Sequence, residues 1–191
     1  MNTLESIREA LPGYARDLQL NLGTVLTPAG APGLSERQIW AVALAAASAS
    51  RNAEFTRRLQ ALAAQHLDAA HVNAAHAAAA IMAMNNVYYR FRHMIGKPSY
   101  DQKPARLRMQ RIAKPASNKP DFELFCLAVS AINGCEMCIR SHEAVVIEGG
   151  LTEDQVHDAV RIAAVVHAAA VALELPVVVE EVAILQPGAI I

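Results

Sequence analysis

The sequence predicts an all-α fold, and three observations lead to that prediction. Hydrophobic residues make up 53% of the 191-residue chain but aromatic residues only 5%, so most apolar side chains are aliphatic and alanine is prominent. Alanine favours helix because it loses no side-chain entropy when a helix forms. Apolar residues recur at steps of three and four, and several helix starts carry capping signals. No segment needs a sheet to explain its pattern.

The N-terminal segment predicts a helix with an interruption. Apolar residues within 4–22 recur at three- and four-residue steps, and the Pro12-Gly13 pair bends or breaks the helix. A loop rich in proline and glycine follows at 28–33. The segment does not resemble a secretory signal, and the longest apolar stretches fall short of the roughly 20 residues that a membrane span needs. We therefore expect a soluble, cytoplasmic protein.

Capping signals predict the central helices. Ser35, with a glutamine three residues later, opens a helix that runs to about residue 50. A further helix covers about 53–64, and Asp68 caps the long helix that follows it, which runs towards Tyr89. Two prolines within 96–105 indicate a linker.

The C-terminal third predicts three more helices and an uncertain tail. Pro120 suits the first turn of a helix, which Asn133-Gly134 ends because both residues tolerate the left-handed conformation. The next helix starts near Cys135 and stops at a glycine pair. Thr152, with a glutamine three residues later, opens a helix to about residue 174. The β-branched tail, 177–185, is expected to be a short helix because no other strand exists to pair with it.

A weak internal repeat indicates two similar halves, at about 35–95 and 120–175, within a single domain over 1–191. The Ala-rich segment that begins at Trp40 resembles the segment that begins at Phe125, 85 residues later. Each is followed by a polar break, a charged helix and a longer Ala-rich helix. The pattern is typical of a duplication in which one copy keeps the chemistry.

Charge and cysteine content narrow the function. The formal net charge is -1, from 17 basic and 18 acidic residues, which favours neither a nucleic-acid nor an anionic-membrane partner and leaves self-association unopposed. The three cysteines cannot all pair within one chain. In a reducing cytosol, a close Cys-x-x-Cys pair indicates redox or metal chemistry rather than a structural disulfide.

The segment from Asn133 to His142 carries the candidate chemistry. On a helix, Cys135 and Cys138 are three residues apart and Cys138 and His142 four apart, so all three side chains share one face. The start of a helix stabilises a thiolate through its free N–H groups and its dipole. The histidine can take or return the thiol proton, and the second thiol can resolve an oxidised cysteine into a disulfide. The pattern predicts a redox-active dithiol.

Glu123 is a candidate partner for the histidine. It lies twelve residues before Cys135, on the preceding predicted helix. If the chain doubles back at Asn133-Gly134, the carboxylate would face His142, orient the ring and raise its basicity. The spacing alone fits a solvated helix residue equally well.

A structural zinc site is the main alternative, since two cysteines and a histidine are all zinc ligands. Zinc needs a fourth ligand, and Cys126 lies within an apolar helical stretch, where we expect it in the core. His71 and His76 are five residues apart, which is poor spacing for a shared ligand, and His76 and His167 are expected to be packed, hydrogen-bonded helix residues. Core-filling roles are predicted for Met82, Met84 and Met94.

Several segments resemble the AhpD family of alkyl hydroperoxide reductase subunits, in the carboxymuconolactone decarboxylase-like superfamily. The redox members of that superfamily show a glutamate, a Cys-x-x-Cys pair and a histidine four residues after the second cysteine, here Glu123, Cys135, Cys138 and His142. The likeness runs over nearly the whole chain. It includes Leu11-Pro-Gly-Tyr-Ala-Arg-Asp, Ile81-Met-Ala-Met-Asn-Asn-Val-Tyr-Tyr-Arg, Phe122-Glu-Leu-Phe and Ala128-Val-Ser-Ala-Ile-Asn-Gly-Cys.

The resemblance implies a helical fold of two similar halves, a homotrimer and an antioxidant role. It implies electron transfer from a dihydrolipoyl group on a lipoylated acyltransferase to a peroxiredoxin or a hydroperoxide, without a bound cofactor or metal. Cys138 would be the attacking thiolate and sulfenic-acid site, and Cys135 the resolving thiol and proton donor. Glu123 would act through His142 as a proton relay.

One residue departs from the family pattern. Relatives often carry a second histidine immediately before the second cysteine, where this chain has Met137. If that histidine tunes the thiolate in relatives, this chain lacks one proton-handling group. The alternatives that remain are a cofactor-less decarboxylase of the same superfamily, acting on a lactone, and a zinc-stabilised helical interaction module.

Overall fold

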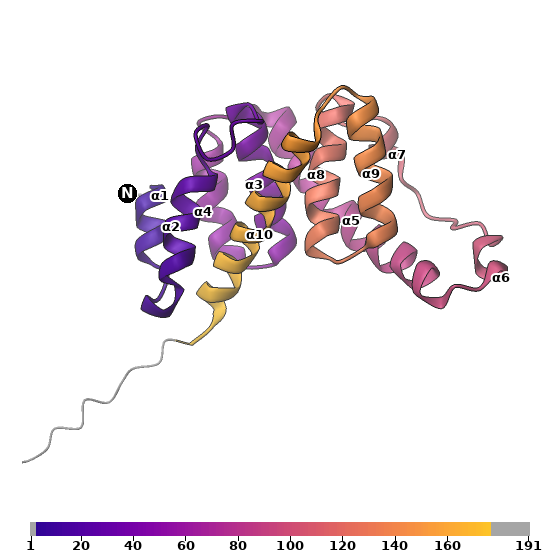
Figure 1. The fold of residues 1–191 in the computed structure, drawn as a ribbon, viewed down its shortest axis with the longest axis horizontal. Helices are drawn as coiled ribbons and strands as arrows, with labels where there is room; N and C mark the ends of the chain where they lie inside the picture. The colour runs from indigo at the N-terminus through magenta and orange to yellow at the C-terminus, as the bar shows by residue number, and fades with distance from the viewer. Residues whose placement is uncertain (1–2, 177–191) are drawn as a thin grey trace, which may run out of the picture.

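The computed structural model describes residues 3–176 and confirms the all-α prediction (Figure 1). Every regular element in that range is helical. The expected helix at 177–185 lies outside the described residues. In chain order the elements are α1 (Leu4–Glu9), the 3₁₀ turn η1 (Gly13–Ala15), α2 (Arg16–Val25), α3 (Glu36–Ser50), α4 (Ala53–Ala63), α5 (Ala69–Ile95), α6 (Pro98–Asp101), α7 (Gln110–Ala113), α8 (Lys119–Ile132), α9 (Glu136–Glu148) and α10 (Glu153–Glu174).

The helix starts follow the side-chain capping expected from the sequence. The Ser35 and Thr152 side chains accept hydrogen bonds from backbone N–H groups three residues on, within complete capping boxes. Asp68 caps α5 in the same way through the N–H of His71. Asn118 caps α8, one turn before the acidic and apolar residues that the helix buries.

The segment after α5 differs from the expected linker. α5 runs on to Ile95 and ends at Gly96, whose left-handed conformation (φ +59°) caps the helix. Within the predicted linker 96–105, Pro98 starts the short helix α6, because proline is pre-organised for a first helical turn. Arg92 of α5 donates to the carbonyl of Asp101, which ties α6 back to α5.

The core lies where α3, α5, α8 and α10 pack together (Figure 1). Residues 41–47 of α3, mostly alanine, are fully buried, since small side chains let neighbouring helices approach closely. α10 is long and apolar enough to cross a membrane by length and composition alone, a feature that the sequence analysis missed. In the structure it packs against α2, α3 and α8, and 44% of its most apolar stretch is buried.

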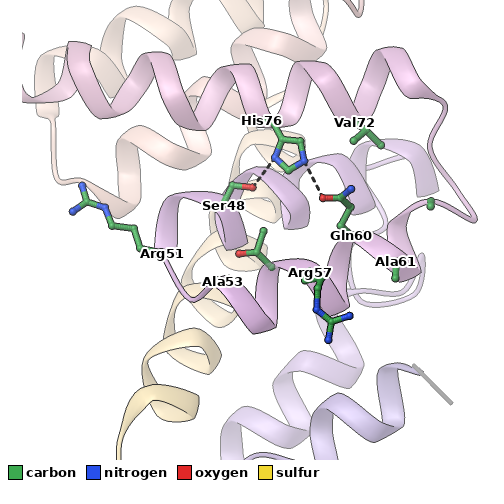
Figure 2. Close-up of a pocket in the computed structure, with 10 residues that line it drawn as sticks. Ser48, Arg51, Ala53, Arg57, Gln60, Ala61, Val72 and His76 are labelled. Atoms are coloured by element: carbon green, nitrogen blue, oxygen red, sulfur yellow. Dashed lines mark hydrogen bonds between the residues drawn. The ribbon is translucent and has the colours of Figure 1, made fainter.

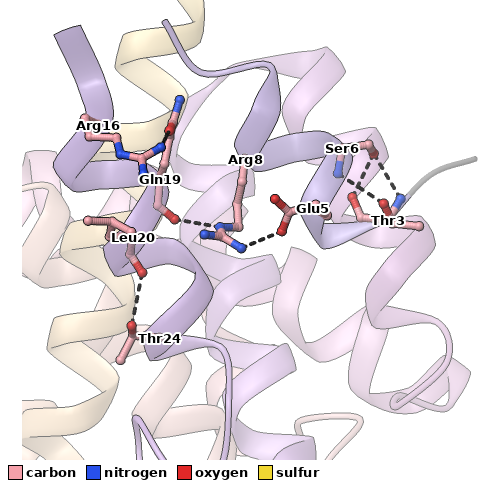
Figure 3. Close-up of polar contacts among 8 residues, drawn as sticks. All are labelled: Thr3, Glu5, Ser6, Arg8, Arg16, Gln19, Leu20 and Thr24. Atoms are coloured by element: carbon pink, nitrogen blue, oxygen red, sulfur yellow. Dashed lines mark hydrogen bonds and ion pairs between the residues drawn. The ribbon is translucent and has the colours of Figure 1, made fainter. Parts of the chain in front are cut away.

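The N-terminal helices close one end of the molecule. In α1, Thr3 and Ser6 form a capping box. Arg8 Nε donates to the carbonyl of Gln19 at 2.7 Å, which joins α1 to α2 (Figure 3). Arg58 of α4 donates to Ser6 Oγ at 3.0 Å. These contacts hold α1 across both α2 and α4.

The helices of the pair α3–α4 and those of the pair α8–α9 begin at a constant separation along the chain. The N-caps Ser35 and Asn118 are 83 residues apart, and so are the N-caps Asn52 and Cys135. This offset of 83 residues differs by two from the 85-residue separation of the apolar pattern, and the N-caps of α5 and α10, Asp68 and Thr152, are 84 residues apart. Ala-rich helices allow such slips, because their side chains resemble one another at many offsets. The division of the domain into two similar halves therefore stays a prediction.

Buried side chains follow the same register. Phe55 and Leu59 of α4 are fully buried, and they lie 83 residues before Cys138 and His142 of α9. The two pairs also differ in their neighbours, because α1 packs against α4 of the first pair and α7 packs against α8 of the second. The first pair thus places core side chains where the second pair places the candidate redox residues.

Candidate active site

The turn between α8 and α9 positions the two cysteines. Gly134 adopts a left-handed conformation (φ +64°), which reverses the chain after Asn133. Cys135 is the N-cap residue of α9, and its N–H donates to the carbonyl of Ser130 at 3.1 Å. Cys138 lies in the first turn of α9, where backbone N–H groups are free of helical partners.

A hydrogen-bond network from α5 holds this turn. Asn86 is buried, and its Nδ2 donates to Ser130 Oγ at 2.9 Å. Asn133 Nδ2 donates to Asn86 Oδ1, also at 2.9 Å. Arg90 donates to the carbonyl of Asn133. The turn that carries Cys135 is therefore fixed by Asn86 and Arg90, whose contacts with it the sequence did not predict.

Cys135 and Cys138 form a disulfide, with Cα atoms 5.3 Å apart. Cys135 is fully buried, and Cys138 is 6% exposed. Only Cys138 of the two lines a cavity of about 410 Å³. The third cysteine, Cys126, is buried in α8 as predicted, and burial, together with the nearby Glu123 carboxylate, raises the pKa of its thiol well above 9.0.

His142 and Glu123 meet beside the disulfide. Nδ1 of His142 lies 2.6 Å from Oε2 of Glu123, and both side chains are buried. On the other edge of the ring, Nε2 lies 3.2 Å from Sδ of Met82. Met82 is fully buried, so its predicted place in the core is confirmed, but its contact with the ring joins residues 60 apart and leaves no signal in sequence spacing.

The cavity at Cys138 has mostly apolar walls. The side chains that surround Cys138 and His142 come from α5, α7, α8, α9 and the residue that caps α7. They can accept a hydrocarbon chain next to the sulfur of Cys138. The remaining lining residues are Asn85, Tyr89, Met109, Ile112, Glu123, Met137, Ser141 and Val145.

Comparison with known proteins places the chain in a family. Residues 98–177 match the model of the carboxymuconolactone decarboxylase family. An alkyl hydroperoxide reductase AhpD of Anaeromyxobacter dehalogenans (strain 2CP-C) is 64% identical over 175 residues, which cover 92% of each chain. The AhpD proteins of Rhodospirillum centenum and Solibacter usitatus are 52% and 48% identical over 172 residues, 90% of this chain and 91% and 96% of theirs. The chain belongs to the AhpD family. The resemblance seen in the sequence is thereby confirmed.

The AhpD-family motif residues converge in the structure. Glu123, Cys135, Cys138 and His142 come from α8, α9 and the turn between them. Met137, where the resemblance leads us to expect a histidine, lies on the wall of the same cavity. Among residues 3–176, no three histidine, cysteine or acidic side chains are grouped as a metal site would require.

A larger cavity, of about 700 Å³, lies between α3, α4 and α5 and contains none of these residues. His76 on its wall is fixed from both sides, by Ser48 Oγ at 3.1 Å from Nδ1 and by Gln60 Oε1 at 3.1 Å from Nε2 (Figure 2). His167 contacts Ser50 Oγ at 3.0 Å. Both histidines are packed, hydrogen-bonded helix residues, as predicted.

Met94 is 77% exposed, so its predicted core role is wrong. It lies in the part of α5 that continues past the α8–α9 pair towards α6 (Figure 1). Helical periodicity places a residue on a face of its helix, but it does not reveal where that helix leaves the core.

Proposed function

We propose that this AhpD-family chain is a soluble, cytoplasmic antioxidant oxidoreductase with alkyl hydroperoxide reductase activity. The observation that carries the proposal is the Cys135–Cys138 pair next to the buried Glu123–His142 contact, with Cys138 open to an apolar cavity. The name shared by the relatives, alkyl hydroperoxide reductase AhpD, supports the same chemistry.

The reaction runs in three balanced steps. The Cys138 thiolate attacks the terminal oxygen of a hydroperoxide, the O–O bond breaks, and a proton completes the alcohol product, leaving a sulfenic acid on Cys138. The Cys135 thiol then attacks that sulfur, and water leaves as the disulfide forms. A dithiol reduces the disulfide by two thiol–disulfide exchanges and becomes a cyclic disulfide itself. Glu123 and His142 relay the protons that these steps release and consume.

The electron donor is a dihydrolipoyl group carried by a lipoylated acyltransferase, and the acceptor is a peroxiredoxin or a hydroperoxide. The apolar walls around Cys138 support this assignment, because a lipoyl arm and an alkyl hydroperoxide both present a hydrocarbon chain next to the reacting atoms. No bound cofactor or metal takes part, since the sulfur atoms accept and pass on the electron pair.

The active form is a homotrimer. In its support, the C-terminal half of α5 exposes an apolar stripe at helical spacing, formed by Val87, Phe91, Met94 and Ile95. An exposed apolar stripe of this kind is typical of an interface. Light scattering coupled to gel filtration should give three times the chain mass, and Phe91→Glu should reduce it to one.

Free-thiol titration tests the redox cycle. Hydroperoxide should remove two thiols per chain from the reduced protein, and dihydrolipoamide should restore them. Cys138→Ser should abolish the peroxide-dependent loss of the pair. Cys126→Ser serves as the matched control and should keep the full cycle, because its thiol is buried away from the cavity.

Three results would overturn the proposal. If hydroperoxide does not change the number of free thiols, the protein could only transfer electrons between the disulfides of partner proteins. Lactone decarboxylation that survives replacement of both Cys135 and Cys138 by serine would favour the decarboxylase alternative. Stoichiometric zinc, with unfolding on chelation, would favour the zinc-stabilised interaction module.

A further inference from the structure

Asn85 is a buried polar side chain without a partner in the cavity at Cys138. It lies on α5, is 4% exposed, and lines the cavity together with Cys138 and His142. Its Oδ1 is buried without a hydrogen bond, and neither end of the amide bonds to any residue within 3–176. The neighbouring Asn86, by contrast, uses both ends of its amide to hold the cysteine turn.

An unpartnered buried amide costs stability, because it loses its hydrogen bonds to water and gains none from the protein. A leucine, which has the same branching, would face the apolar walls without that cost. A bound ligand that forms hydrogen bonds with the Asn85 amide would offset this loss of stability. The cavity already contains the sulfur atom that reacts, so the ligand is the substrate of that sulfur.

A hydroperoxide matches the hydrogen-bonding groups of this amide. Its terminal oxygen carries one O–H donor, and its inner oxygen is an acceptor that develops negative charge as the O–O bond breaks. The amide of Asn85 offers one acceptor, Oδ1, and two N–H donors on Nδ2. A dialkyl disulfide has no O–H and no comparable acceptor, so the same amide contributes little to disulfide exchange.

We propose that Asn85 binds the hydroperoxide group of the substrate, accepting its O–H at Oδ1 and donating from Nδ2 to the inner oxygen. The inference rests on the proposed peroxide reaction and deepens it. In the first step, the Cys138 sulfur bonds to the terminal oxygen while the inner oxygen leaves with the electron pair of the O–O bond. The Nδ2 donor stabilises that oxygen until it takes up a proton and departs as the alcohol.

The two half-reactions of the cycle provide the test. Asn85→Leu removes both hydrogen-bonding ends while keeping the branching of the side chain, and Asn85→Ala removes them while leaving space. Disulfide formation by cumene hydroperoxide is followed after rapid mixing with reduced protein. Reduction of the preformed disulfide by dihydrolipoamide is followed on the same protein. Asn73→Leu, at an exposed position on α5, is the matched control.

Both Asn85 variants should slow the peroxide step by at least about tenfold, as removal of a donor to a developing oxyanion does. Their reduction by dihydrolipoamide should stay within about twofold of wild type, and the urea midpoint of Asn85→Leu should not fall. Equal slowing of both half-reactions would show that Asn85 only shapes the cavity, and an unchanged peroxide step would overturn the proposal.

Failure of the proposed function itself looks different. Wild-type protein would then form no disulfide with peroxide at all, whatever residue occupies position 85. If wild type and the Asn85 variants complete the redox cycle equally fast, the proposed redox function is supported and the proposed role of Asn85 is wrong.

Discussion

Nδ1 of His142 and Oε2 of Glu123 lie 2.6 Å apart, although the two residues are 19 positions apart in the chain and belong to different helices. The reversal at Asn133-Gly134 brings α9 back along α8 and makes this contact. Both side chains are buried, so water and salt screen the interaction little. The pair can therefore hold a proton next to Cys138 and exchange it with the cavity.

Replacing Glu123 by glutamine tests the relay. Glutamine keeps the size of the side chain but cannot carry the negative charge or take up a proton. We expect peroxide-driven disulfide formation to slow by about 100-fold, the usual range for loss of a group in acid–base catalysis. Stopped-flow thiol titration measures the rate.

Glu148→Gln, at an exposed position on the same helix as His142, is the matched control and should react at the wild-type rate. A Glu123→Gln protein that also reacts at the wild-type rate would remove Glu123 from the mechanism.

Met82 and Glu123 contact opposite edges of the His142 ring, Met82 at Nε2 and Glu123 at Nδ1. A thioether sulfur has no proton to donate, so the 3.2 Å contact is a hydrogen bond only when Nε2 is protonated. A carboxylate accepts a hydrogen bond far more strongly than a thioether does, so the neutral ring should carry its proton on Nδ1 and donate it to Glu123 in both wild type and Met82→Leu. Nitrogen-15 NMR of the histidine ring distinguishes the two tautomers, and a neutral ring protonated on Nε2 in wild type would contradict this assignment.

Much of the fold could be predicted because local chemistry determines it. Ser35 and Thr152 mark their helices through capping boxes, and Gly134 marks a reversal through its backbone freedom. The 83-residue offset between the α3–α4 and α8–α9 pairs could not be predicted, because alanine-rich helices match at several offsets. The exposure of Met94 depends on how far α5 extends beyond its neighbours, which periodicity does not encode.

The candidate site likewise has residues that the sequence could predict and residues that it could not. Cys138 and His142 lie four residues apart within α9, so their spacing alone places them on one face, whereas Cys135 is the extended N-cap residue before the helix and not part of its first turn. Glu123 needed the assumption that the chain reverses before α9. Asn85 and Met82 come from α5, and only the packing of α5 against α8 and α9 brings them to the cysteines. Contacts between distant helices leave no pattern within either helix.

Cys126 should be unreactive in the folded protein. Burial, and secondarily the negative charge of Glu123, raises the pKa of its thiol well above 9.0, so the thiolate is scarce at pH 8. Iodoacetamide at pH 8 should modify reduced Cys138 and leave Cys126 unmodified until urea unfolds the chain. Peptide mass spectrometry locates the label, and rapid labelling of Cys126 in folded protein would show that α8 opens readily.

Asn86 should matter for stability. Its removal in Asn86→Ala leaves the hydroxyl of Ser130 and the amide of Asn133 without their partner, which should lower the free energy of unfolding by about 1–3 kcal/mol. Asn73→Ala, exposed on the same helix, should change it by no more than about 0.5 kcal/mol. Urea unfolding followed by circular dichroism provides both values, and equal effects would show that the network around the cysteine turn contributes nothing.

His76 should make stability depend on pH. Partial burial lowers the pKa of its ring below the usual 6.5, so the unfolded chain takes up a proton at a higher pH than the folded chain does. The stability that the neutral ring contributes is therefore complete above pH 6.5 and is lost as the pH falls through the folded pKa. His76→Gln removes this contribution, so the difference in unfolding free energy between wild type and variant should shrink between pH 7.5 and pH 5. Urea titrations across that range measure the difference, and parallel curves would mean that the ring between Ser48 and Gln60 takes up its proton equally well in the folded and unfolded chain.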